Sequence, residues 1–449
     1  MRKFLKWFFP GLKVKRWLFL IAAGLFVLIL GLTLLSDQHL FSRLEMTLRG
    51  VMKKLTGAEH ETLIGLFFLL TGLFAVCLGM QKTIQSIITT LLPESEQKII
   101  DILYNRHYLR RGPRVVVIGG GTGLSVLLRG LKKYTSNITA IVTVADDGGS
   151  SGQLRGEMGI LPPGDIRNCL VALADRETLL EELLQFRFTD GSLEGHNLGN
   201  LFIAALTRIT GRFEQAVKEM SRVLAVRGQV LPATLEDVTL YAELEDGTVV
   251  AGESRIGKCR GIKRVYIKPE DCKPLPEAVE AIAEADAVII GPGSLYTSIM
   301  PNLLVQRLRE AVKSSPAVKI YVCNIMTQPE ETHGYTASRH VQALLDHFGP
   351  GLFDYVIVNK DEPSRKILQE CQRKGYAFVK PDIKAIERMG LKVKTESLWD
   401  RETGLLHDGD KLARVILATI LENKTTAEKL NFLDLYLLVD KIKGISRFS

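Results

Sequence analysis

A glycine-rich turn between an apolar run and a helical run constrains this chain more than any other feature. The run Val115–Ile118 is rich in β-branched residues, four glycines follow in the five residues Gly119–Gly123, and Leu124–Lys133 has helical spacing. Glycine lets the backbone turn sharply and approach a ligand, and a helix start offers unpaired N–H groups. The pattern predicts a strand–turn–helix unit that binds a phosphate, with the Thr122 hydroxyl as a further donor. The alternative is a plain strand-to-helix turn.

The turn matches neither of two well-known phosphate-binding fingerprints. Leu124 occupies the position of the last glycine in G-x-G-x-x-G, and no Gly-Lys-Ser/Thr of a Walker A loop follows. Because the dinucleotide fingerprint is broken and no catalytic pair is evident, an NAD-type dehydrogenase is disfavoured.

Apolar runs continue to alternate with helical segments along the rest of the chain. Strands that are apolar throughout, with helices between them, indicate a parallel sheet covered on both faces. Right-handed crossovers then give a doubly wound, Rossmann-like α/β fold. The later strands that we expect are Ile138–Val144, Ala287–Ile290, Ile320–Cys323 and Tyr355–Val358. A small antiparallel insertion is expected from Val238–Leu244, Thr248–Ser254 and Ile262–Ile267.

Two charge-free apolar runs precede this domain. Trp17–Leu35 and Leu63–Met80 are each about as long as the 20 or so residues that span a bilayer core. They predict a transmembrane hairpin in contact with the lipid bilayer; the alternative is a pair of buried core helices. Six basic residues precede the first run, so the positive-inside rule places the N-terminus and the main domain in the cytoplasm of a multi-pass protein of the cell membrane.

Composition agrees with a large globular domain plus appendages. The chain is 46% apolar and 24% charged, and part of its net charge of +8 lies in the basic N-terminal stretch, so we expect no nucleic-acid partner. Its six scattered cysteines favour a reducing compartment over a disulfide framework. We expect a membrane hairpin at 1–82, a connector at 83–113, a Rossmann-like domain at 114–423 and a helical tail at 424–449.

An acidic pair, Asp146 and Asp147, follows the second predicted strand and precedes a glycine- and serine-rich loop. Paired carboxylates beside a phosphate suit Mg²⁺, and one of them could instead act as a base toward a hydroxyl. The alternative is a solvated loop with an Asx turn.

Other polar motifs fall at predicted helix starts. In PPGDIRNCL, Asp165 is either the helix N-cap or a ligand contact, and Asn168 lies in the first helical turn. GHNLGNLF offers His196, Asn197 and Asn200 for a polar ligand. The loop Gly291–Ser298 predicts a second phosphate- or base-contacting turn on the same sheet edge.

Together these motifs resemble the YvcK/CofD-like family, and within it the gluconeogenesis-factor branch rather than the 2-phospho-L-lactate transferase branch. The matching stretches, which extend from Val115 to about Ile420, are GGGTGLSVLLRGLK, ITAIVTVADDGGSSG, PPGDIRN, GHNLGNL, VRGQVLPAT, IGPGSLYTS, NIMTQ and HDGDKLA. The chain departs from the family pattern at Leu406, where relatives have an arginine before the His-Asp pair.

The resemblance implies binding of a UDP-sugar, without an established reaction, and a role in cell shape and wall growth on gluconeogenic carbon. Wall-synthesis proteins would then be partners, and we also expect a homo-oligomer. The alternative function is a Mg²⁺-dependent phosphotransferase. Carried over by motif, Asp146 and Asp147 would there bind the metal ion and contact the acceptor substrate. The ligand-binding residues predicted from the motifs and the resemblance are Gly120, Gly121, Thr122, Gly123, Leu124, Asn168, His196, Asn197, Asn200, Gly293, Ser294, Leu295, Thr297 and Asn324.

Overall fold

The computed structural model describes residues 15–35, 61–91, 109–175, 178–400 and 404–425. The chain forms two compact units, Met1–Arg106 and His107–Ser449. The predicted tail at 424–449 lies outside the described residues from residue 426 onward, as does the part of the predicted connector that spans 92–108.

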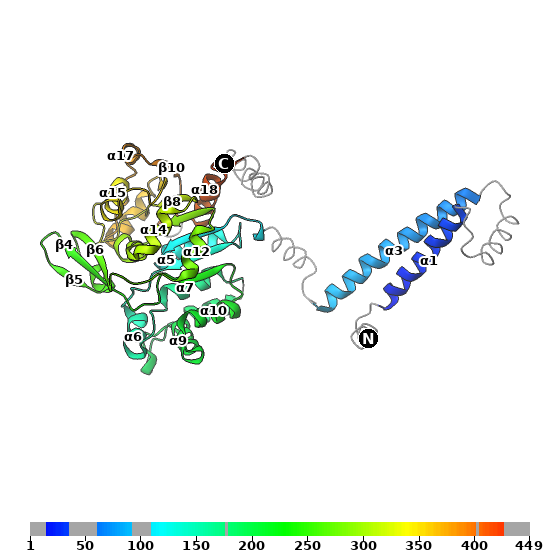
Figure 1. Ribbon diagram of the computed structural model, residues 1–449, viewed down its shortest axis with the longest axis horizontal. Helices are drawn as coiled ribbons and strands as arrows, with labels where there is room; N and C mark the ends of the chain where they lie inside the picture. The colour runs from blue at the N-terminus through cyan, green and yellow to red at the C-terminus, as the bar shows by residue number, and fades with distance from the viewer. Residues whose placement is uncertain (1–14, 36–60, 92–108, 176–177, 401–403, 426–449) are drawn as a thin grey trace. The chain divides into compact units, whose positions relative to one another are not determined.

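The first unit contains two long apolar helices, α1 (Lys15–Leu35) and α3 (Glu61–Leu91), which pack against each other as a pair (Figure 1). The segments Lys15–Thr33 and Gly65–Ser86 have the length and composition of membrane spans. The second helix continues past the predicted span end at Met80, so the predicted boundary between hairpin and connector falls inside α3.

Glycines set the close approach of these two helices. A Cβ atom on Gly31 would lie 2.6 Å from the backbone nitrogen of Leu69, and one on Gly72 would lie 2.5 Å from that of Leu28. Small residues at a helix interface allow the backbones to meet in this way, as in helix pairs within membranes.

The second unit is built on a seven-stranded parallel sheet in the order β10-β9-β8-β7-β1-β2-β3. Its strands are β1 (Val115–Gly119), β2 (Ile138–Val142), β3 (Gln229–Pro232), β7 (Ala287–Ile290), β8 (Val318–Val322), β9 (Tyr355–Asn359) and β10 (Lys392–Glu396). This confirms the predicted doubly wound α/β fold. The two edge strands, β3 and β10, were not among the predicted strands, because β3 is short and β10 carries alternating polar residues.

The order of the strands reverses between β1 and β7. From β1 the chain moves to β2 and β3, whereas from β7 it moves the other way to β8, β9 and β10. Right-handed crossovers in opposite directions place the intervening helices on opposite faces of the sheet. Such a reversal is the topological switch point, outside which open α/β sheets bind their ligands.

Helices of ordinary length cover the sheet. Near its centre α5 (Gly121–Leu131) packs against α7 (Gly164–Leu173) and α18 (Gly409–Glu422), whereas α12 (Pro276–Ala283) packs against α14 (Gln306–Ser314). The other helices are α6 (Gly149–Met158), α8 (Thr178–Gln185), α9 (Leu198–Thr210), α10 (Phe213–Val223), α13 (Met300–Leu304), α15 (Ala337–Phe348), α16 (Arg365–Arg373) and α17 (Ile383–Arg388). Short turns form at Gly191–Leu193 and at η4 (Leu295–Ile299), the latter a π-helical turn.

The predicted antiparallel insertion is confirmed as a three-stranded sheet in the order β5-β4-β6. Its strands are β4 (Thr239–Leu244), β5 (Val249–Ala251) and β6 (Ile262–Lys268), and the short helix α11 (Glu253–Ile256) follows β5. We call residues 239–268 the flap. In Figure 1 the flap projects at the left of the globular unit.

Candidate functional site

A cavity of about 410 Å³ lies where the two glycine turns meet at the switch point. Gly123 and Pro292 bring the turns into contact, since a Cβ atom on Gly123 would lie 3.3 Å from the carbonyl group of Pro292. Of the residues predicted to bind ligand, the cavity is lined by Gly120, Gly121, Thr122, Gly123, Gly293, Ser294 and Asn324. The structure therefore brings both predicted phosphate-binding turns to one site.

The first turn is held by Asp165. Its carboxylate accepts a hydrogen bond from the N–H of Gly121, which has a φ of 70°. A Cβ atom on Gly120 would lie 2.5 Å from Asp165 Oδ2, so glycine is required for this contact. The capping prediction for Asp165 is wrong, because Pro163 precedes the helix as its N-cap and no side chain caps it. Burial is the main reason that the pKa of Asp165 rises to about 6.

The second turn is held by two asparagines. Asn324 Nδ2 donates to the carbonyl of Gly293 at 2.8 Å, and Asn324 Oδ1 accepts from its N–H at 3.3 Å. Asn302 Nδ2 donates to the carbonyl of Gly119 at 3.1 Å and to that of Ser298 at 2.8 Å. Asn302 thus ties the second turn to the end of β1, although the sequence analysis did not single it out.

Glu331 occupies the backbone donors of η4. Its carboxylate accepts from the N–H groups of Tyr296 and Thr297, and burial raises its pKa to about 7. Thr297 also directs its hydroxyl to Glu331 at 3.4 Å. Of the predicted ligand contacts, Thr297 is therefore paired inside the protein, and Leu124 and Leu295 are fully buried in the core.

The acidic pair lies beside the first turn, and its side chains also hold backbone groups. Asp146 accepts from the N–H of Gly148 at 2.9 Å, and Asp147 accepts from the N–H of Ser254 in the flap at 2.8 Å. Glu253, at the start of α11, faces the same carboxylates. Burial, together with the negative charge of Asp146, raises the pKa of Glu253 to about 8. Nothing in the local sequence of Glu253 had indicated this position.

The predicted magnesium site remains a prediction. Mg²⁺ bound with a phosphate commonly uses one or two protein carboxylates, a number that Asp146 and Asp147 can supply. Across the described ranges no group of three or more His, Cys, Asp or Glu side chains is arranged to hold a metal ion.

The predicted residues of GHNLGNLF form a network around Ser150. The Ser150 hydroxyl lies 3.3 Å from His196 Nδ1 and accepts from the Asn197 N–H and from Asn200 Nδ2, each at 3.2 Å. Asn197 is the N-cap of α9 and accepts from the Asn200 N–H. Asn197 and Asn200 are buried, so they shape the loop beside the acidic pair and do not line the cavity between the glycine turns.

The sequence analysis missed several residues that line the cavity. The additional lining residues are Pro292, Ser298, Ile325, Met326, Gln328, Tyr376, Leu405, Leu406 and His407. Burial lowers the pKa of His407 to about 4, and its Nε2 lies 3.2 Å from the carbonyl of Cys323. Leu406 lines the cavity together with Ile325 and Met326, and these three side chains form an apolar wall.

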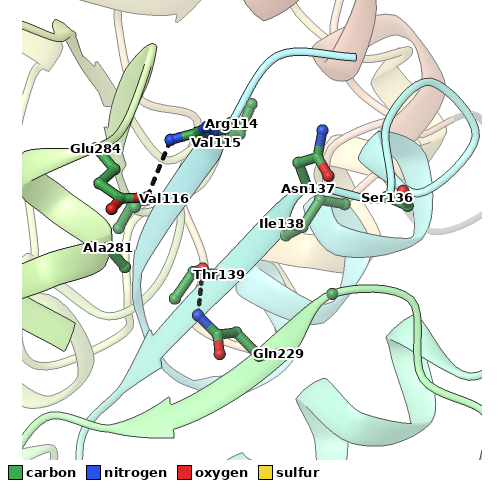
Figure 2. Close-up of a pocket in the computed structure, with 11 residues that line it drawn as sticks. Arg114, Val115, Val116, Ser136, Asn137, Ile138, Thr139, Gln229, Ala281 and Glu284 are labelled. Atoms are coloured by element: carbon green, nitrogen blue, oxygen red, sulfur yellow. Dashed lines mark hydrogen bonds and ion pairs between the residues drawn. The ribbon is translucent and has the colours of Figure 1, made fainter. Parts of the chain in front are cut away.

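A second cavity, of about 290 Å³, lies at the opposite edge of the sheet, near the amino ends of β1 and β2. Figure 2 shows Gln229 donating to the Thr139 hydroxyl at 3.0 Å and Arg114 paired with Glu284 at 2.9 Å. These polar groups satisfy one another, and both members of the ion pair are exposed.

Comparison with known proteins agrees with the fold and the motifs. A family model described as 2-phospho-L-lactate transferase CofD matches residues 115–399. The gluconeogenesis factor of Bacillus subtilis is 52% identical over 313 residues, covering 69% of this chain and 99% of that protein. A Nostoc sp. protein assigned as a gluconeogenesis factor is 49% identical over 423 residues, covering 93% of this chain and 92% of its own length. The match to the Nostoc protein therefore extends well beyond the globular domain.

The solved structures agree as well. The crystal structure of a UPF0052-family protein from Bacillus halodurans superimposes with a TM-score of 0.66 at 51% identity, covering 68% of this chain and 99% of that one. At this identity and coverage the relationship is one of family and not only of fold. The chain belongs to the gluconeogenesis factor family, and its globular unit carries the CofD-type domain.

Proposed function

We propose that the globular unit binds a UDP-sugar, such as UDP-N-acetylglucosamine, in the cavity between the glycine turns. The observation that carries this proposal is that both turns, which follow β1 and β7 at the switch point, line one cavity. Asp165 occupies the Gly121 N–H, but the first turn of α5 has further backbone N–H groups without intrahelical partners, which suit a diphosphate. The apolar wall and Tyr376 offer a surface for a base.

In this proposal the bound ligand regulates cell shape and cell-wall synthesis during growth on gluconeogenic carbon. Tyr376 and His407 are the titratable side chains among the residues that line the cavity, and burial keeps His407 neutral. A cavity lined in this way favours binding over turnover. The signal would pass to wall-synthesis proteins, from a homo-oligomer held at the cell membrane by α1 and α3 with its globular unit in the cytoplasm.

The ligand is tested by thermal unfolding of the full chain in detergent micelles with UDP-N-acetylglucosamine, GDP or NAD. A ligand that binds only the folded state stabilises it by about 2.7 kcal/mol at a hundredfold excess over Kd. We expect the UDP-sugar to raise the melting temperature most. An unchanged melting temperature with every uridine nucleotide would refute the proposed ligand.

Regulation and location need separate tests. A strain that lacks the protein should lose its normal shape on gluconeogenic carbon, and a chain that cannot bind the UDP-sugar should fail to restore it.

The full chain should sediment with membranes, and protease should digest the globular unit in inverted vesicles but not in intact cells. Digestion from the outside of intact cells would contradict the proposed topology.

A Mg²⁺-dependent phosphotransferase activity is the second candidate. The carboxylates that gather beside the first turn favour it: Asp146, Asp147, Asp165 and Glu253. The full chain would be incubated with Mg²⁺ and a GDP-activated donor, and nucleotide release would be measured. If Asp147→Asn leaves any release unchanged, Asp147 has no part in such a reaction.

A further inference from the structure

Arg167 is a buried cation whose guanidinium is only partly paired. Its side chain is 8% exposed, and its Nη2 donates to Asn168 Oδ1 at 2.7 Å. Its Nε and Nη1 atoms are buried and have no hydrogen-bond partner among the described residues. Unpaired buried donors are destabilising, and more so when they carry charge, which suggests that a partner is missing.

Both positive and negative groups surround Arg167. Its Cγ and Cδ atoms pack on the backbone at Gly199, in the first turn of α9, where a Cβ atom would lie 2.7 Å from Arg167 Cδ. Arg187 also acts on the guanidinium electrostatically. The positive end of the α9 dipole and these two guanidinium groups together favour an anion.

Asp165 and Asp146 also act on Arg167 electrostatically, but no hydrogen bond joins either carboxylate to it within the described structure. Asp165 directs its carboxylate to the Gly121 N–H instead, and Asp146 accepts from the Gly148 N–H. Burial lowers the pKa of Arg167 to about 10, so the side chain stays charged at neutral pH.

Arg167 shares a helix start with the residue that holds the first glycine turn. It is in the first turn of α7, two residues after Asp165, which touches both Gly120 and Gly121. The start of α7 therefore carries both the carboxylate that holds the turn and the partly paired guanidinium.

We propose that Arg167 forms an anion-binding site on the α7–α9 side of the first glycine turn. Its free Nε and Nη1 donors would bind an oxyanion of the ligand. The proposal deepens the proposed function and rests on the same site. The oxyanion, a phosphate or a carboxylate, has two sources: the diphosphate of the UDP-sugar, or a separate anionic molecule beside it. Guanidinium groups suit both, because their donors match planar and tetrahedral oxyanions.

The test compares the full chain in detergent micelles with Arg167→Met, Arg167→Lys and the control Arg222→Met. Arg222 lies on α10, where its side chain is 75% exposed and paired with Glu219. Calorimetry would measure the affinity for UDP, for UDP-N-acetylglucosamine, and for inorganic phosphate with and without saturating uridine.

We expect one of two results with Arg167→Met, both with Arg222→Met unchanged. If the diphosphate is the source, the affinity for UDP falls at least tenfold. If a separate anion is the source, UDP binds as before and inorganic phosphate loses at least tenfold in affinity. Unchanged affinities for UDP and phosphate would overturn the proposal and leave the guanidinium with internal water as its partner.

Two further outcomes are distinguishable. If the wild-type chain binds phosphate through Arg167 but binds no uridine nucleotide, the UDP-sugar proposal fails and the proposed anion-binding site is supported. If Arg167→Met does not fold, Arg167→Lys decides, because its single ammonium group cannot supply donors at both positions. We expect at least fivefold weaker anion binding from that variant, and wild-type affinity would overturn the proposal.

Discussion

Asn324 holds Gly293 by both ends of its side-chain amide, donating to the glycine carbonyl and accepting from the glycine N–H. Asn324 was predicted to bind ligand, and it does line the cavity. Its amide is used to fix the second turn, so any effect of Asn324 on binding would come at least partly through the shape of that turn.

Asn324→Ala should therefore weaken folding and binding together. The variant leaves two partly buried backbone groups without their partner, which costs about 1–3 kcal/mol of folding free energy. We expect the affinity for UDP-N-acetylglucosamine to fall about tenfold, a change of about 1.4 kcal/mol. Gln306→Ala, at an exposed position of α14, should change neither quantity. A variant with wild-type stability and affinity would show that Gly293 does not need this clamp.

Glu331→Gln should make the protein less sensitive to pH. Burial raises the pKa of Glu331 from 4.5 to about 7 in the folded protein. The folded state therefore holds this proton more tightly than the unfolded state, and stability falls as the pH rises from about 4.5 to about 7. The glutamine stays neutral and can still accept from the backbone N–H groups.

The measurement is the melting temperature of both proteins at pH 5 and pH 8. We expect the substitution to change the free energy of unfolding more favourably at pH 8 than at pH 5. The difference between its effects at the two pH values should be on the order of 3 kcal/mol. Glu310→Gln, on the exposed side of α14, is the matched control and should behave alike at both pH values. An equal effect of Glu331→Gln at the two pH values would contradict the assigned pKa.

Gly120→Ala should disrupt the first turn, whereas Gly119→Ala should be tolerated. The new Cβ atom would lie 2.5 Å from Asp165 Oδ2 in the first case, whereas at Gly119 its nearest neighbour would be Leu124 Cδ1 at 3.6 Å. Overpacking of this kind costs about 1–3 kcal/mol. Denaturant unfolding and nucleotide titration of both variants would test this, and equal losses from the two substitutions would contradict the role of the Asp165 contact.

Gly72→Leu should separate the two long helices of the first unit. Even a Cβ atom at this position would lie 2.5 Å from the backbone nitrogen of Leu28. The distance between spin labels at Phe19 and Met80, measured in the full chain, should increase and broaden. Phe74→Leu, at a side chain that is 67% exposed, is the control and should preserve the distance. An unchanged distance in Gly72→Leu would show that glycine packing does not hold the pair.

Much of the fold could be predicted because it depends on local patterns. Short uninterrupted apolar runs predicted β1, β7 and β9, and the D-G turn predicted the hairpin of the flap. The edge strands escaped prediction, since Lys392–Glu396 alternates charged and uncharged residues and has no apolar run. Their pairing is decided by the neighbouring strand in the sheet and not by their own composition.

The sequence by itself determined the glycine turns, the five inner strands of the parallel sheet, and the two long apolar helices. These features follow from backbone freedom and from the period of apolar residues, which are properties of neighbouring positions. Only the tertiary structure decided that Asp165 holds Gly121, that Glu331 occupies the donors of η4, and that Arg167 is left with unpaired donors. Such pairings join segments far apart in the chain, and their geometry and burial arise only when the sheet has formed.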